Sequence, residues 1–308
     1  MSTRVFIDGA AGTTGLEIHE RLKDRAEFDL IVLDDAQRKD EAARKEALHE
    51  ADVAILCLPD DAAREALKLA EGSNTRIIDA SSAHRVADGW TYGFPELIGH
   101  EQVANAQFVS NPGCYPTGFL ALIAPLVRNG LLPAHYPFTV NAVSGYSGGG
   151  NALIGRFEGD EPEIAFRAYG LNLGHKHLPE MQRHAGLTRP PVFSPSVIHC
   201  RRGMIVDVPL HLEPETRPVS AMQDQLIDFY KDAQLVHVIP NGQGLGEILQ
   251  TTDAEAYDGL TLTVCRSEDG NQARLISMLD NLGKGASGAA IQNLNIMCGL
   301  PETTGLRL

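Results

Sequence analysis

One cysteine has the surroundings of a reactive nucleophile. Cys114 lies in the segment 110–118, SNPGCYPTG, in which Pro112 and Gly113 favour a tight bend. Pro116 suits the first position of a helix, where the N–H that it lacks would be unpaired anyway. The thiol would then lie near a helix N-terminus, where free N–H groups and the helix dipole favour the thiolate. We therefore expect Cys114 to be a nucleophile, although many free cysteines are buried and inert.

The other four cysteines lack such a turn. Cys200 is the only rival nucleophile, because two arginines follow it, whereas Cys57 and Cys265 lie in segments typical of a core. The five cysteines form no CxxC pair, so the sequence indicates neither a metal site nor a disulfide framework. Free thiols suit a reducing compartment, and we expect a cytoplasmic protein.

A second group of reactive side chains lies in residues 174–180, GHKHLPE. A thiolate mechanism needs a proton donor and acceptor near neutral pH, which is the usual role of histidine. We expect His177 to have this role and Glu180 to orient its ring, and we expect His175 to point in a different direction in an extended segment. The alternative is that these are ordinary surface or core residues, since the chain has 11 histidines.

A glycine-rich turn lies near the N-terminus, in residues 8–15, DGAAGTTG. It follows an apolar strand and precedes a helix, which is the context of a dinucleotide-binding turn. Gly9, Gly12 and Gly15 would let a pyrophosphate approach the N–H groups of the helix. The spacing GxxGxxG matches the common fingerprint only in part, and an ordinary strand–helix turn is the alternative.

The residues leave the choice of nicotinamide cofactor open. Asp34 and Asp35 follow the second predicted strand, where an acid favours a free ribose 2′-hydroxyl. Arg38 and Lys39 follow a few residues later and would suit a 2′-phosphate.

Two further features suit an anionic ligand. The loop 144–151, SGYSGGGN, contains Ser144 and Gly148, and its N–H groups could hold an anion or leave room for a nicotinamide ring. Arg85 and Arg202 could each clamp a carboxylate or a phosphate. A flexible connector and solvated surface arginines are the alternatives.

The predicted elements that position these residues fall into two groups. In the first part, strands at 4–7, 30–33, 52–58 and 76–79 alternate with helices at 16–23, 40–50 and 60–69, which predicts a Rossmann-like parallel sheet. After Cys114 we expect helices at 119–129, 222–231 and 272–282, with Pro125 kinking the first. Strands are predicted at 138–143, 192–199, 204–212 and 260–266, several of them alternating as antiparallel strands do.

The fold class is therefore α/β, with a second α+β domain whose sheet is mainly antiparallel. We expect residues 1–113 to form the dinucleotide-binding domain, joined by the C-terminal helix 286–308, and residues 114–285 to form the catalytic and oligomerisation domain. The length of 308 residues suits two domains. The net charge of -14 argues against nucleic-acid partners, and no apolar run is long enough for a membrane span or a signal peptide.

Taken together, the motifs resemble those of a known family. The glycine turn is followed in order by CLPD at 57–60, DASSAHR at 79–85, YGFPEL at 92–97, NPGCYPT at 111–117, SGYSG at 144–148, HKHLPE at 175–180, RGM at 202–204 and QNLN at 292–295. This order resembles the shorter form of N-acetyl-gamma-glutamyl-phosphate reductase, of arginine biosynthesis, over nearly the whole chain. His84 stands where that family more often has an aromatic residue.

The resemblance implies NADPH-dependent reduction of an acyl phosphate to N-acetylglutamate semialdehyde, with release of phosphate. It implies Cys114 as the nucleophile that forms a thioester, His177 as the acid/base group, NADP rather than NAD, and a homo-oligomer, a dimer or a tetramer. The implied cofactor-binding residues are Gly9, Gly12, Thr13, Thr14, Gly15, Arg38, Gly148 and Asn293, and the implied substrate-binding residues are Arg85, Ser144, Glu180 and Arg202.

Two other functions remain as alternatives. Aspartate-semialdehyde dehydrogenase has the same two-domain plan and a cysteine thioester, but the segments around Cys114 and His177 argue against it. A redox sensor that binds NADPH without turnover would have no need of the His-x-His segment.

Overall fold

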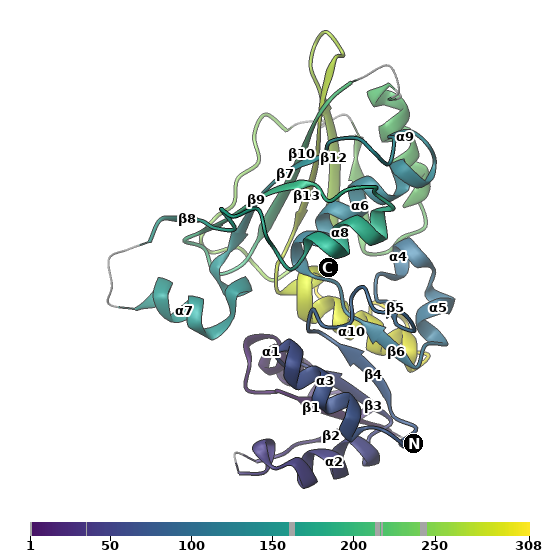
Figure 1. Cartoon of the computed structure of the whole chain (residues 1–308), viewed down its shortest axis with the longest axis vertical. Coiled ribbons are helices and arrows are strands. Elements are labelled where there is room, and N and C mark those ends of the chain that lie inside the picture. The colour runs from purple at the N-terminus through teal and green to yellow at the C-terminus, as the bar shows by residue number, and fades with distance from the viewer. Residues whose placement is uncertain (1, 35, 160–163, 213–215, 217, 241–244) are drawn as a thin grey trace. The chain divides into compact units, whose positions relative to one another are not determined.

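The computed structural model describes residues 2–34, 36–159, 164–212, 216, 218–240 and 245–308. The chain forms two compact units, coloured along the sequence in Figure 1. The first unit comprises Met1–Gly113 and Ala286–Leu306, and the second comprises Cys114–Gly285 with Arg307–Leu308. Within the described residues, no helix is both long and apolar enough to cross a membrane.

The first unit contains a six-stranded sheet in the order β2-β1-β3-β4-β6-β5, with every pairing parallel. Apolar side chains pack on both faces of its strands, which explains the continuous apolar segments of the sequence. They are β1 (Thr3–Asp8), β2 (Phe28–Ile31), β3 (Val53–Leu56), β4 (Arg76–Asp79), β5 (Thr91–Tyr92) and β6 (Phe108–Ser110).

Helices cover both faces of this sheet. On one face, Val5 and Ile55 pack in a core with residues of α1 and α10; on the other, Phe6 and Ala54 pack with residues of α2 and α3. The C-terminal helix is therefore part of the core of the first unit. The helices are α1 (Thr13–Leu22), α2 (Glu41–Glu50), α3 (Asp60–Leu69), α4 (Pro95–Ile98), α5 (His100–Ala104) and α10 (Gly288–Met297), with the short turn η1 (Gln37–Lys39).

The second unit contains a seven-stranded mixed sheet in the order β11-β12-β13-β10-β7-β9-β8. Among the described residues, four of its pairings are antiparallel and two are parallel. The strands are β7 (Thr139–Gly145), β8 (Phe166–Ala168), β9 (Val192–Ile198), β10 (Met204–His211), β11 (Val236–Ile239), β12 (Leu260–Arg266) and β13 (Gln272–Leu279).

Helix α6 (Cys114–Arg128) packs directly on this sheet. A Cβ on Gly118 would overlap Ser277 Oγ and lie 2.8 Å from Val206 Cγ2, so the glycine permits close contact with β13 and β10. The helices α8 (Leu178–Ala185) and α9 (Val219–Phe229) pack beside α6, and α7 (Gly150–Glu158) follows the turn η2 (Tyr146–Gly149) (Figure 1).

The helix predicted at 272–282 is wrong. This segment forms β13, which pairs with β10 on one side and β12 on the other. Leu275, Ile276 and Ser277 are three consecutive buried residues, so the alternation that identifies a strand is lost there. The tight turn before it ends at Gly270, whose φ of +74° favours glycine.

A proline inside α6 leaves one backbone carbonyl without its usual partner. Pro125 has no N–H for the carbonyl of Ala121, four residues earlier. The buried hydroxyl of Tyr230, just after α9, donates to that carbonyl at 2.9 Å. The helix therefore continues through Pro125 to Arg128 because a side chain from another helix supplies the missing donor.

Candidate active site

Cys114 is the first residue of α6. The helix begins two residues earlier than a first-position Pro116 would require. Pro116 still fits as the third residue, because the N–H groups of the first turn have no partner within the helix. A Cβ on Gly285 would lie 2.9 Å from Cys114 Cβ, so the glycine makes room for the cysteine.

The turn that precedes Cys114 is held by side chains of the first unit. Asn111 Nδ2 donates to the carbonyl of Ala286 at 3.0 Å, and Asn293 Nδ2 donates to Asn111 Oδ1 at 3.1 Å and to the Gly93 carbonyl at 3.0 Å. Arg85 Nε donates to the Asn111 carbonyl at 3.0 Å. Asn111 and Asn293 are at most 1% exposed. The backbone before the candidate nucleophile is thus fixed by three buried polar side chains.

His175 and His177 form a turn rather than an extended segment, and their rings contact each other at a centroid distance of 4.7 Å. The backbone N–H of His177 donates to His175 Nδ1 at 3.1 Å. Burial, reinforced by Lys176, lowers the pKa of His175 to about 4, so this ring is neutral and able to accept.

His177 lies directly before α8 and is 5% exposed. Its ring lies 5.9 Å from the ring of Tyr115, the neighbour of Cys114. Glu180 is buried in the first turn of α8. The fold therefore brings the histidine segment to the start of α6.

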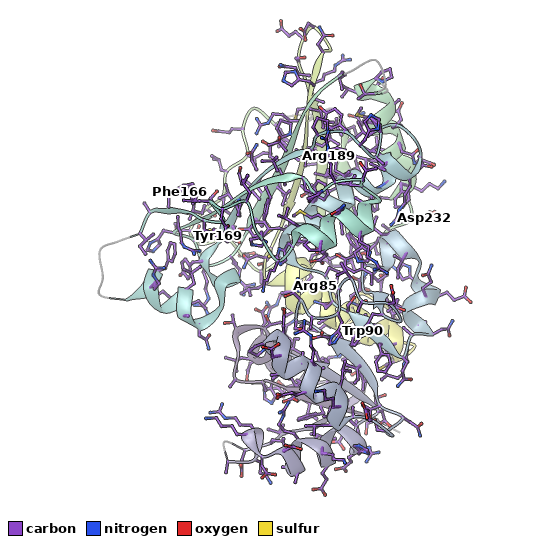
Figure 2. All side chains as sticks on the ribbon, viewed as in Figure 1. Arg85, Trp90, Phe166, Tyr169, Arg189 and Asp232 are labelled. Atoms are coloured by element: carbon purple, nitrogen blue, oxygen red, sulfur yellow. The ribbon has the colours of Figure 1, made fainter. Side chains whose placement is uncertain are left out.

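Tyr169 belongs to the same cluster, although no sequence motif identified it. It follows β8 (Figure 2), and its hydroxyl donates to the Tyr115 hydroxyl at 3.3 Å. Tyr115 in turn donates to the Ser196 carbonyl at 3.2 Å. Burial, with a smaller contribution from the charge of Cys114, raises the pKa of Tyr169 to about 12. Tyr169 is therefore a neutral hydroxyl close to the candidate nucleophile.

The predicted loop 144–151 is instead the end of β7 with Ser144, the turn η2 with Gly148 and the start of α7. Ser144 and Gly148 lie with Arg202 around two residues that sequence reasoning missed, Asp280 and Asn281. Arg202 Nη1 lies 2.7 Å from Asp280 Oδ2, and Asn281 accepts from the Gly203 N–H at 2.9 Å. A Cβ on Gly148 would lie 3.4 Å from both Asn281 Nδ2 and Ser144 Oγ. The arginine is thus already engaged with a buried carboxylate.

The rival cysteine lacks the features of a nucleophile. Cys200 is 2% exposed, and burial raises the pKa of its thiol. Burial likewise raises the pKa of the Cys57 thiol, to about 12, which disfavours its thiolate.

A pocket of about 790 Å³ opens beside the glycine turn of the first unit. Gly9 and Cys57 line it and directly follow β1 and β3. The pocket therefore lies at the carboxyl ends of these strands, where the strand order reverses, which is the usual ligand site of such sheets. Gly9 has a φ of +92°, and a Cβ there would overlap the Cys57 carbonyl oxygen. Gly12 caps α1, whose first turn has no acidic residue. The turn therefore fits a dinucleotide pyrophosphate.

The charged residues beyond β2 favour a 2′-phosphate. Asp34 Oδ1 accepts from the N–H groups of Ala36 and Gln37 at 2.9 and 2.8 Å, so it caps η1. Arg38 and Lys39 line the pocket. Asp34 is not among the described residues that line it. Asp35 lies outside the described residues.

Known proteins match the chain over nearly its whole length. Residues 4–106 match the model of the semialdehyde dehydrogenase NAD binding domain, and residues 114–281 match that of the semialdehyde dehydrogenase dimerisation domain. The N-acetyl-gamma-glutamyl-phosphate reductase of Trichormus variabilis is 48% identical over 318 residues, covering 98% of this chain and 99% of the relative. The chain belongs to the N-acetyl-gamma-glutamyl-phosphate reductase family.

Another member of the N-acetyl-gamma-glutamyl-phosphate reductase family, from Brucella ovis, is 49% identical over 311 residues, covering 97% of this chain and all of the relative. Aspartate semialdehyde dehydrogenase II of Vibrio cholerae, complexed with ASA, has the same fold, with a TM-score of 0.73 over 96% of this chain and 98% of its own. Its identity is only 17%, so this likeness concerns the fold and lends the dehydrogenase alternative no further support.

Proposed function

We propose that this protein reduces N-acetyl-gamma-glutamyl phosphate to N-acetylglutamate 5-semialdehyde, using NADPH and releasing phosphate, in arginine biosynthesis. The observation that carries the proposal is the position of Cys114 as the first residue of α6, with the His175–His177 segment packed on its neighbour Tyr115. Identities of 48% and 49% to the named reductases, over nearly the full length of the chain, support this substrate.

The residues of the chain account for the steps of this reaction. Cys114, as a thiolate, attacks the acyl carbon and displaces phosphate, which leaves a thioester on the sulfur. Bound NADPH supplies the hydride. His177 donates a proton to the oxyanion of the resulting hemithioacetal. It takes this proton back when the aldehyde forms and Cys114 leaves again as a thiolate. His175 holds the backbone at His177 without titrating near neutral pH.

We assign the remaining contacts according to the ligand that each residue would bind. Arg38 is assigned to the 2′-phosphate, and Gly148 and Asn293 to the nicotinamide end of the cofactor; the pyrophosphate is assigned to Gly9, Gly12, Thr13, Thr14 and Gly15. Arg85, Ser144, Glu180 and Arg202 are assigned to the substrate. Arg85 and Arg202 would act from fixed positions, because Arg85 donates to backbone carbonyls and Arg202 to Asp280.

The test is phosphate-dependent reduction of NADP with N-acetylglutamate semialdehyde, with aspartate semialdehyde as the comparison substrate. Cys114→Ser should abolish turnover, and His177→Asn should lower kcat by a factor of about 100 to 10,000 and change its pH profile. Cys200→Ser is the matched control and should retain turnover. Loss of activity in the Cys200 variant alone, or a preference for aspartate semialdehyde, would overturn the proposal. Tight NADPH binding with no turnover on either aldehyde would indicate a sensor.

We further propose that the protein is a cytoplasmic homo-oligomer, a dimer or a tetramer, assembled through the second unit. The sheet face opposite α6 carries apolar side chains that are partly exposed, among them Val143, Ile205 and Met278. The match of 114–281 to a dimerisation domain supports this surface. Light scattering of the purified protein measures the assembly, and a monomer at micromolar concentration would contradict it.

A further inference from the structure

An ion pair at the dinucleotide pocket has no role in the chemistry above. Asp8 ends β1, and Arg44 lies in the first half of α2. Arg44 Nε and Nη2 both donate to the Asp8 carboxylate, with Nη2 at 2.8 Å from Oδ2. The two side chains are only 5% and 14% exposed, and both line the pocket.

A carboxylate in this position is unfavourable for a dinucleotide. Asp8 directly precedes Gly9, the first glycine of the turn that fits the pyrophosphate. The pyrophosphate and the 2′-phosphate of NADPH are negatively charged at neutral pH. Because the Asp8 side chain is only 5% exposed, it repels a like charge more strongly than it would in water. An unpaired Asp8 would therefore oppose cofactor binding.

Arg44 neutralises the one carboxylate among the described lining residues of the pocket. The described lining residues include three cations, Arg38, Lys39 and Arg44, and one carboxylate, Asp8. Because Arg44 spans the Asp8 carboxylate with two donors, their charges cancel within the pair. The pair then adds no net charge to the pocket, which Arg38 and Lys39 also line, in a chain whose net charge is -14.

We propose that Arg44 masks the charge of Asp8 and thereby sets the preference of the pocket for NADPH over NADH. Arg44 is in this view a specificity-determining residue that acts through Asp8 and not by contact with the 2′-phosphate. The inference rests on the proposed use of NADPH. Because the 2′-phosphate adds about two negative charges, an unmasked Asp8 should weaken NADPH binding more than NADH binding.

The experiment is calorimetric titration of the full-length protein with NADPH and with NADH, in the absence of substrate. Arg44→Met keeps most of the apolar stem and exposes the Asp8 charge. It should raise the Kd for NADPH on the order of tenfold and raise the Kd for NADH less. At high salt, which screens charges, the increase in the Kd for NADPH should be smaller. Asp8→Asn alone should not weaken NADPH binding. The double variant should recover to within about threefold of the wild type.

Arg64→Met is the matched control. Arg64 pairs with Asp61 at 3.0 Å on the surface of α3, where the side chains are 51% and 98% exposed. This variant changes the net charge by the same amount and should leave both Kd values unchanged. Thermal melts without cofactor identify any variant whose fold is damaged, and the NADPH-to-NADH ratio then reports the masking separately from stability.

The outcomes distinguish the inference from the proposed function. If the double variant binds NADPH as weakly as Arg44→Met, Arg44 contacts the cofactor itself and the masking is wrong. The masking is also wrong if Arg44→Met binds like the wild type or weakens both cofactors equally. If the wild type binds neither cofactor, or prefers NADH, the proposed use of NADPH fails instead.

Discussion

His175 and His177 divide the work of one motif. His177 lies beside Tyr115 with its backbone fixed, and His175 fixes it by accepting its N–H. Only a neutral ring can accept at Nδ1, so the lowered pKa of His175 and this hydrogen bond support each other. His175, which fixes the backbone, is therefore as informative as His177, whose backbone it fixes.

The pKa of His175 predicts an acid-dependent loss of stability. The folded value of about 4 lies below the ordinary value of about 6.5, so the unfolded chain binds the proton first as the pH falls. The stability due to the neutral ring is complete above about pH 6.5 and is lost as the pH falls toward 4. His175→Asn retains an acceptor for the His177 N–H but does not titrate, so it should lose less stability across this window.

Urea unfolding at several pH values checks this prediction. His237→Asn, on the exposed side of β11, is the matched control and should behave like the wild type. Equal losses of stability for the wild type and His175→Asn would show that His175 does not carry the effect.

The residue types were sufficient to identify Cys114 and the histidine segment as candidates, because their chemistry is visible in a short stretch of sequence. Tyr169, Asp280 and Asn281 could not be found in this way. Tyr169 reaches Tyr115 across 54 residues, and Arg202 reaches Asp280 across 78. Such contacts depend on the arrangement of the sheet and leave no local pattern.

At the scale of elements, the parallel strands of the first unit were predictable because each alternates with a helix and is apolar throughout. β13 was not, since its residues 275, 276, 278 and 279 are apolar and the spacing also suits a helix. Partners on both sides, β10 and β12, decide its conformation. Local periodicity cannot report on such neighbours.

The contact between Tyr230 and α6 predicts a specific loss of stability. Tyr230→Phe leaves the buried Ala121 carbonyl without a donor and should cost about 1 to 3 kcal/mol. In a Pro125→Ala background, the alanine N–H can bond to this carbonyl, so the same change at Tyr230 should cost less. Urea unfolding of the four proteins measures both costs. If the two costs are the same, the hydroxyl does not compensate for the proline.

At the scale of the whole molecule, the chain returns to its first unit at the end. Ile291 and Leu294 of α10 lie in the same core as Val5 and Ile55. A fragment of residues 1–113 alone should therefore unfold or aggregate. Joining it to residues 286–306 by a short glycine linker should restore a cooperative fold, because the Asn111 side chain bonds to the Ala286 carbonyl and the two ends are close.

Circular dichroism melts of the two fragments test this expectation. Leu294→Ala in the joined fragment is a graded version of the same test and should cost about 2 to 5 kcal/mol, since the leucine is fully buried. Cooperative melting of residues 1–113 without α10 would contradict the role of this helix.

The cap that Asp34 places on η1 has a consequence for redesign of the cofactor site. An acid after β2 is the residue that usually selects NADH, and this chain already has one. Its Oδ1 already accepts hydrogen bonds from the N–H groups of Ala36 and Gln37. The conformation of the turn, and not the residue type, therefore keeps this oxygen from binding a ribose. Conversion toward NADH would therefore require a rebuilt turn that releases Asp34, together with removal of Arg38 and Lys39; inserting another acid would not suffice.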